Sequence, residues 1–206
     1  MTAGLGEIWE TEAMAVKPYP VCHFLHGCAE AAAAIWRQVK PEPADMTRIR
    51  AFVAEPTITI VTEPLAKKRR PTTDYEAKFS TQFVTAASLL RGGFGLKELE
   101  DASLADERIL SVSERVEVLV DPDTAFPTYY SGGVEVTLRD GRVLREHVRV
   151  NRGAGDRALT NAEILEKYME TATIAVPRER AERIRDAVLD MERVPVAKLW
   201  KLLATG

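Results

Sequence analysis

Hydrophobic and polar positions follow two different periods along this chain of 206 residues. Alternation with a period of two, which is typical of strands, occurs at residues 8–16, 46–53 and 115–120. It occurs again at residues 130–139 and 142–150, on either side of Asp140-Gly141. Because Asp-Gly between two alternating stretches is a strong hairpin signal, we predict an antiparallel sheet.

Other stretches repeat their apolar residues every three or four positions and predict helices. One runs from residue 27 to 39 and ends before the prolines of Lys40-Pro41-Glu42-Pro43. Another begins at a capping-box pattern formed by Thr73 and Glu76 and ends at Gly92-Gly93. Its predicted apolar stripe consists of Tyr75, Phe79, Phe83, Ala86 and Leu90.

The remaining helices are shorter or lie near the C-terminus. Residues 96–112 predict one or two short helices, and residues 57–61 fit either a strand or a short helix. Thr160 and Glu163 form a second capping-box pattern, which opens a helix to about residue 171. Pro177 and Pro195 stand where the first turns of two terminal helices would begin.

Helices and antiparallel strands in mixed order indicate the α+β class. We predict an α+β domain at residues 1–172, followed by terminal helices at residues 173–206. The helices within residues 178–204 have apolar faces, with Trp200 on the second of them. Such faces predict association, as a dimer or with a separate subunit.

Composition excludes some classes of function. The chain has 46% hydrophobic and 29% charged residues and a net charge of −3, so it lacks the basic excess of a general nucleic-acid binder. The N-terminal residues do not resemble a signal peptide, and no apolar run approaches the length of a membrane span. We therefore expect a cytoplasmic protein that binds neither nucleic acid nor membrane.

The richest local chemistry lies in Lys17-Pro18-Tyr19-Pro20-Val21-Cys22-His23-Phe24-Leu25-His26-Gly27-Cys28. Two prolines keep this loop extended, and the helix that follows presents free N–H groups at its start. A cation, two imidazoles and a helix N-terminus together predict a site for a carboxylate. His23 and His26 are candidate general acids or bases, because imidazole titrates near neutral pH.

The Cys and His side chains of this loop could also serve as metal ligands. Thiolates and imidazoles can bind zinc, but the spacing of Cys22, His23, His26 and Cys28 fits no standard closed site, so we predict no metal. The two cysteines are expected to be free thiols.

His147 is predicted to be an exposed cross-strand residue. The basic run Lys67-Lys68-Arg69-Arg70 is either a solvated loop or a surface that attracts polyanionic substrates.

Three motifs resemble the C-terminal region of the MmgE/PrpD family, which includes 2-methylcitrate dehydratase, cis-aconitate decarboxylase and iminodisuccinate epimerase. The first is the loop that begins Lys17-Pro18-Tyr19-Pro20. The second is Glu76-Ala77-Lys78-Phe79-Ser80 with the helix that follows. The third is residues 133–142 together with residues 159–168. These motifs occur in the family's order and extend through most of the chain.

The resemblance implies a small α+β lid domain that in the family follows a longer all-helical domain. It implies that Lys17 lines the active site and that Lys78 and Ser80 lie near the cleft. Tyr19 and Cys22, in the same loop as Lys17, are further candidates for substrate binding. His26 matches the family better than His23, whose position is often arginine there. The family's dehydratases are typically metal-independent, so no cofactor is expected.

Our leading hypothesis is the C-terminal part or subunit of a lyase-type enzyme that acts on a citrate-like di- or tricarboxylic acid. The reaction would be hydration or dehydration, decarboxylation or epimerisation, and activity would need the helical domain, in the same chain or as a separate subunit. A homo-oligomer is expected. The alternative is a non-catalytic domain that binds small carboxylates or a protein partner.

Overall fold

The chain is divided into two compact units in the computed structural model, Met1–Ala158 and Leu159–Gly206. The structure describes residues 4–9, 11 and 14–204. The sequence pattern placed the domain boundary later, at residue 172. Helix α8 (Asn161–Ala175) packs on α9 (Arg178–Leu189), however, and therefore groups with the terminal helices.

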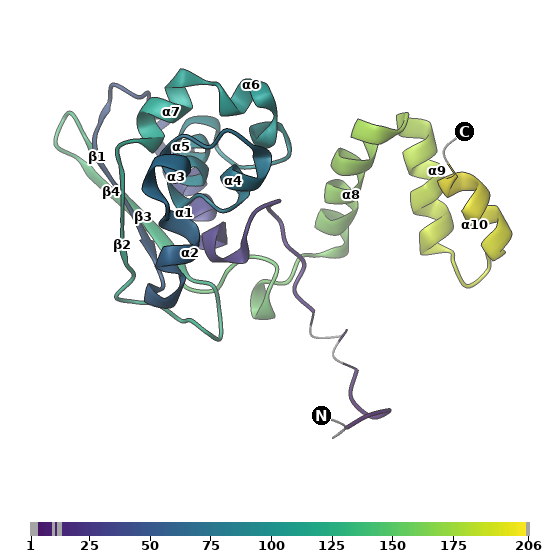
Figure 1. Cartoon of the computed structure of the whole chain (residues 1–206). Helices are drawn as coiled ribbons and strands as arrows, with labels where there is room; N and C mark the ends of the chain where they lie inside the picture. The colour runs from purple at the N-terminus through teal and green to yellow at the C-terminus, as the bar shows by residue number, and fades with distance from the viewer. Residues whose placement is uncertain (1–3, 10, 12–13, 205–206) are drawn as a thin grey trace. The chain divides into compact units, whose positions relative to one another are not determined.

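The first unit consists of a sheet and a layer of short helices (Figure 1). Its strands are β1 (Met46–Val53), β2 (Val116–Val120), β3 (Gly132–Leu138) and β4 (Val143–Val148). Its α-helices are α1 (His26–Val39), α2 (Ile58–Thr62), α3 (Leu65–Arg69), α4 (Asp74–Lys78), α5 (Thr81–Arg91), α6 (Asp101–Leu104) and α7 (Glu107–Ser113). Single 3₁₀ turns occur at η2 (His23–Leu25), η3 (Glu55–Thr57), η4 (Lys97–Leu99) and η5 (Gly155–Arg157).

The four-stranded sheet has the order β2-β1-β3-β4. The predicted hairpin is confirmed, since β3 and β4 are antiparallel around Asp140-Gly141, with Val136 opposite Leu144. The sheet also contains one parallel pair, because β1 and β2 run in the same direction, with Ile49 opposite Val116. The helices between β1 and β2 provide the long crossover that parallel strands require.

The two faces of the sheet differ because side chains alternate along each strand. The inner face is apolar and fully covered, with Ile49, Ala51, Val134 and Val136 at most 1% exposed. Figure 1 shows the helices of this unit gathered on one side of the sheet, where α1 and α5 cross the strands. The outer face carries paired charges, among them Arg50 and Glu135 at 3.1 Å.

Helix α1 approaches the sheet closely because it has no large side chain at the crossing point. A Cβ atom added at Gly27 would lie 2.4 Å from the backbone nitrogen of Gly132. Buried alanines follow at positions 29, 31, 32 and 33, so α1 packs closely both on the sheet and on α5. The small residues of α1 therefore allow close packing, and the contact of Gly27 with Gly132 places the start of α1 against β3.

The predicted helix after Thr73 is interrupted. Helix α4 ends at Lys78, and α5 begins after Ser80, whose hydroxyl caps α5 by accepting from the Phe83 N–H at 2.9 Å. Thr73 caps α4 as predicted, but the carboxylate of Glu76 accepts from Thr72 and not from Thr73. The predicted stripe fails at Tyr75, which is 69% exposed, because the break changes the direction of the chain.

Several shorter predictions are settled by the structure. Residues 8, 9 and 14–16 form no strand, and residues 10, 12 and 13 of that predicted strand lie outside the described part. The ambiguous segment 57–61 is helical, in η3 and α2. Gly92 ends α5 in the left-handed region, at φ 79°, as predicted for a C-terminal glycine.

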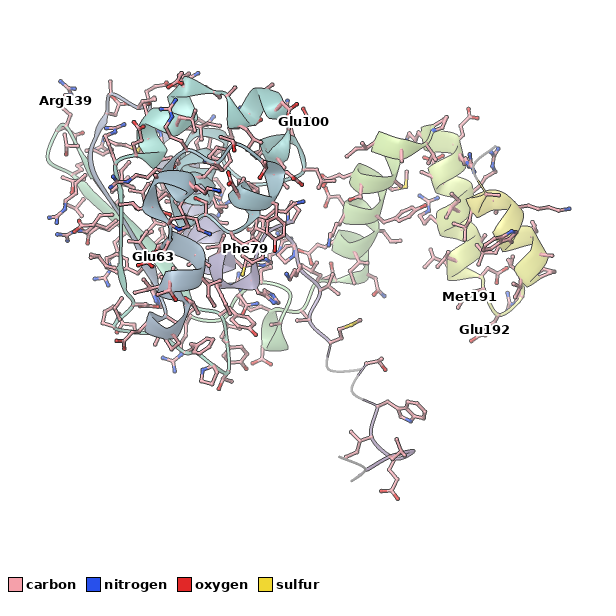
Figure 2. The ribbon with its side chains drawn as sticks, viewed as in Figure 1. Glu63, Phe79, Glu100, Arg139, Met191 and Glu192 are labelled. Atoms are coloured by element: carbon pink, nitrogen blue, oxygen red, sulfur yellow. The ribbon has the colours of Figure 1, made fainter. Side chains whose placement is uncertain are left out.

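The second unit consists of α8, α9 and α10 (Val196–Leu203). The predicted capping box of α8 is confirmed, although the helix extends to Ala175. The Tyr168 hydroxyl donates to the Ala181 carbonyl at 2.9 Å and joins α8 to α9. Figure 2 shows Met191 and Glu192 in the turn between α9 and α10. Among the described residues, no helix is long and apolar enough to cross a membrane.

Candidate functional site

The backbone of the predicted site is held by two neighbouring segments. The Val16 N–H donates to the Gly153 carbonyl at 3.1 Å, which joins the segment before Lys17 to the loop after β4. The Cys22 N–H donates to the Lys78 carbonyl at 2.9 Å, which joins the loop to the end of α4. The loop then forms η2 and continues into α1, so both histidines lie at the start of this helix.

Lys17 lies on the exposed side of the loop. Its ammonium group donates to the Val21 carbonyl at 3.3 Å, which turns the side chain back over its own loop. The cation is close enough to His23 to lower the pKa of that imidazole, an effect second to that of burial. Lys17 and His23 therefore share one electrostatic environment.

His23 is half-buried and lies between aromatic rings. Its imidazole stacks on the ring of Tyr130, with centroids 4.7 Å apart and planes inclined by 26°. The His26 ring lies on another side, at 4.5 Å. Burial, and then the Lys17 cation, lower the pKa of His23 below its usual value of 6.5. Both effects favour the uncharged form of this imidazole.

His26, by contrast, is fully buried. Its Nε2 donates to the Val21 carbonyl at 3.4 Å, and its ring meets that of Tyr19 edge to face at 5.3 Å. The structure thus brings His26 into the same cluster as His23, but as the inner member. A ligand that approaches from solvent meets His23 first.

Tyr19 lies beside the histidines in a half-buried position. Burial raises the pKa of its phenol, and the Glu30 carboxylate acts in the same direction. The guanidinium groups of Arg152 and Arg37 oppose this effect, and that of Arg152 is hydrogen-bonded to Tyr19. Arg152 thereby adds a second cation to the cluster that begins with Lys17.

The two cysteines differ in accessibility, and both are free thiols as predicted. Cys22 is half-buried. Cys28 is fully buried between α1 and the sheet, and its thiol donates to the Phe52 carbonyl at 3.3 Å. Burial raises the pKa of Cys28 to about 12, so this thiol stays protonated and unreactive.

Lys78 and Ser80 lie outside the histidine cluster. The Lys78 ammonium pairs with Asp74 at 2.5 Å and lines a separate surface depression of about 480 Å³. That depression is formed by residues 72–74 and 78 with residues 96 and 99–101. Ser80 is fully buried, caps α5 and donates to the Lys68 carbonyl. The Ser80 hydroxyl thus has a structural role in this unit.

The basic run 67–70 lies in α3 and at its C-terminal end and not in a loop, and Lys67 and Arg70 are exposed but paired with carboxylates of the same unit. Arg70 contacts Glu107 at 2.5 Å and Glu114 at 3.1 Å, and Lys67 contacts Glu76 at 3.0 Å. Lys68 is buried and donates to two backbone carbonyls. These contacts connect α3 to α2, α4 and α7.

Besides Arg152, sequence reasoning missed two residues that complete the cluster, Tyr130 and Asn151. Asn151 is fully buried, its Oδ1 accepts from the Tyr130 N–H at 3.0 Å, and its Nδ2 lies 3.4 Å from Nε2 of His23. Both residues come from segments more than a hundred positions after the loop, so no local pattern could reveal them. The one available signal was the polar triplet Asn151-Arg152-Gly153 directly after a strand.

His147 also differs from its prediction. It is not a freely exposed strand residue, because its Nε2 lies 2.9 Å from a carboxylate oxygen of the buried Asp121. This pair joins β4 to the end of β2 across the outer face of the sheet. Among the described residues, no group of three or more His, Cys, Asp and Glu side chains is arranged to hold a metal ion.

Fold and site together define a class: an α+β domain whose first helix opens on a half-buried cluster of imidazole, phenol and cationic side chains. The chain belongs to the MmgE/PrpD family, since it matches the sequence profile of the MmgE/PrpD C-terminal domain over residues 19–193. This match covers the loop from Tyr19 onward, the sheet, α8 and α9, and it confirms the resemblance found in the sequence motifs.

Curated relatives are similar to nearly the whole chain. A cis-aconitate decarboxylase-like protein of Aspergillus oryzae is 25% identical over 211 residues, covering 99% of this chain and 43% of the relative. The cis-aconitate decarboxylases of Mus musculus and Homo sapiens are 26% and 24% identical and cover 97% and 94% of this chain. The chain spans about two fifths of the length of these relatives.

Proposed function

We propose that this chain is the C-terminal, lid-forming part of an MmgE/PrpD-type enzyme that acts on a citrate-like di- or tricarboxylic acid. The observation that carries the proposal is the cluster at the start of α1, where Lys17 and Arg152 lie beside the packed rings of Tyr19, His23 and His26. The names of the relatives, which are cis-aconitate decarboxylases or similar to them, support a substrate of this class.

The chemistry of the cluster suits such a substrate. Lys17 and Arg152 would bind carboxylate groups, because charge-assisted hydrogen bonds to carboxylates are among the strongest in proteins. His23 would donate a hydrogen bond to the substrate, with its ring in contact with those of Tyr130 and His26. Negative charge that develops next to a carboxylate would be stabilised by the same cations. Tyr19 and Cys22 would line the binding surface.

The cluster is one wall of an active site, and we propose that a helical domain supplies the other. Relatives are more than twice as long as this chain, which leaves room for such a domain. The terminal helices would pack against it, because several of their large apolar side chains are exposed. These residues are Ile174, Val188, Leu189, Met191, Val196, Trp200 and Leu203, which are between 47% and 81% exposed.

Two experiments test the proposal. The first purifies this chain by affinity from its native source and measures the intact mass of everything recovered. A longer form of the polypeptide, a helical partner in equal amount, or an oligomer of either would agree with the proposal. Recovery of only the 22.9 kDa chain would instead favour a non-catalytic carboxylate-binding domain.

The second experiment assays the assembled enzyme with cis-aconitate, 2-methylcitrate and iminodisuccinate. A Lys17→Ala variant should lose roughly 10- to 150-fold in kcat/KM, since a hydrogen bond to a charged group contributes about 1.5–3 kcal/mol. Lys97→Ala is the matched control, because Lys97 is an exposed lysine in η4. Equal activity of the two variants would contradict the proposed role of Lys17.

A further inference from the structure

Asn151 occupies an unusual place for a polar residue, because it lies just after β4 and is fully buried. A buried amide needs partners for both its carbonyl oxygen and its amino group. The oxygen accepts from the Tyr130 N–H at 3.0 Å, and the amino nitrogen lies 3.4 Å from Nε2 of His23. Asn151 thus connects the loop before β3 to the histidine of the site.

The backbone contact decides which way the amide faces. A backbone N–H can only donate, so the atom of Asn151 next to Tyr130 has to be the carbonyl oxygen. A flipped amide would place two donors face to face at this contact. The group directed at His23 is therefore the NH₂, which can only donate, and Nε2 of His23 has to accept.

We propose that Asn151 is a positioning residue that holds His23 as a neutral imidazole with its proton on Nδ1. Because Nε2 accepts from Asn151, that nitrogen carries no proton in this arrangement. Nδ1–H is then the one ring N–H with which neutral His23 can donate a hydrogen bond to a substrate. This inference rests on the proposed function only in naming a carboxylate substrate as the acceptor of that hydrogen bond.

The groups around His23 also favour its neutral form. The charged or titratable groups that face it are Lys17 from its own loop and His26 from α1, with the Tyr130 ring stacked on the imidazole. Lys17 and burial both disfavour the imidazolium form. The neutral ring of His23 is therefore suited to donate a hydrogen bond from Nδ1 to a carboxylate oxygen of the substrate.

The test is the protonation state of each ring nitrogen of His23, measured by long-range ¹H–¹⁵N NMR on the full chain. The chain has three histidines, so the signals can be assigned with one His→Gln variant for each. We expect the His23 spectrum at pH 7.5 to show a protonated Nδ1 and an unprotonated Nε2. A protonated Nε2 in the wild-type chain would overturn the inference.

An Asn151→Asp variant reverses the polarity of this contact and keeps its shape. One carboxylate oxygen still accepts from the Tyr130 N–H, while the other now faces Nε2 as an acceptor. We expect the proton to move to Nε2 and the pKa of His23 to rise by about 1–3 units, as for other groups beside an opposite charge. A folded variant with unchanged tautomer and unchanged pKa would refute the positioning role.

Two further variants separate this role from a structural one. Asn161→Asp makes the same chemical change at an exposed position of α8 and should leave the His23 spectrum unchanged. Asn151→Ala removes the donor, and we expect a mixture of His23 tautomers if the chain remains folded. Titration of the wild-type chain with citrate is scored separately: a tautomer as predicted without citrate binding counts against the proposed function alone.

Discussion

A Gly153→Ala substitution should separate the Lys17 loop from the loop that carries Asn151. Gly153 has a φ of +90°, and a Cβ atom added there would lie 2.0 Å from the Val16 carbonyl oxygen. No real Cβ atom approaches an oxygen that closely, so one of the two segments has to move. The segment that contains Val16 is the one that can give way, because it lies outside the sheet and the helical layer.

Two contributions set the magnitude of the effect. A left-handed conformation costs a residue with a Cβ atom about 1–2 kcal/mol. Displacement of Val16 also breaks its hydrogen bond to the Gly153 carbonyl, which contributes about 0.5–1.5 kcal/mol. We therefore expect the free energy of unfolding of the first unit to fall by about 1.5–3.5 kcal/mol.

Gly141→Ala is the matched control for this experiment. Gly141 has almost the same φ, +87°, but nothing lies within 4 Å of an added Cβ atom. It should therefore show the conformational cost alone. Unfolding in urea can be followed by the fluorescence of Trp36, which is half-buried, whereas Trp9 and Trp200 are 66% and 71% exposed and should respond little.

Hydrogen exchange provides the site-specific measurement. The Val16 amide should exchange faster in Gly153→Ala than in the wild-type chain, and should be unaffected by Gly141→Ala. Equal destabilisation by both variants, with unchanged protection of the Val16 amide, would refute the argument that Gly153 clamps the two segments.

Three other predictions follow from the same structure. Gly27→Ala should lower the free energy of unfolding by about 1–3 kcal/mol despite the better helix propensity of alanine, because the added methyl group meets the backbone of Gly132; urea denaturation measures this. Thr160→Ala should destabilise α8 by about 1 kcal/mol through loss of the cap on Glu163, seen as faster amide exchange in its first turn. The lowered pKa of His23 means that the unfolded chain binds more protons below about pH 6.5, so the melting temperature should fall as the pH is lowered through this range, and should fall less in His23→Gln.

Elements with a complete local signal were predicted well from the sequence. The bounds of β1 agree with the alternating stretch, and the turn at Asp140-Gly141 lies where its dipeptide indicates. The cap of α8 combines Thr160 and Glu163, two residues that are three positions apart. In each case the residues that determine the structure are neighbours in the sequence, so their pattern could be interpreted without the fold.

Features that depend on distant segments could not be predicted in this way. The parallel pairing of β1 with β2 is set by how the intervening helices pack, and the alternation of a strand does not specify the direction of its neighbour. The break before α5 was missed because Ser80 caps a new helix inside an apparently continuous apolar pattern. His147 was misjudged because its partner, Asp121, comes from another strand's end.

In the candidate site, too, residues of one short segment could be predicted, whereas contacts with distant segments could not. The loop at residues 17–26 was found from its composition, and the structure does bring Lys17, Tyr19, His23 and His26 together. Lys78 and Ser80 were included through the family motif, but here their side chains pair with Asp74 and cap α5. The motif contributes to the site through its backbone, since the Lys78 carbonyl accepts from the Cys22 N–H and holds the loop in place.

The arrangement of the cluster is determined by backbone contacts within the first unit. Gly153 holds the Lys17 segment, the close approach of Gly27 to Gly132 fixes the start of α1, and Asn151 is tied to a backbone N–H. Groups held in this way are preorganised, so they lose little freedom when a ligand binds. A helical domain would then need to close the other side of the site without reshaping this one. Weak anion binding by the chain alone should accordingly depend on Lys17 in the same direction as turnover by the assembled enzyme.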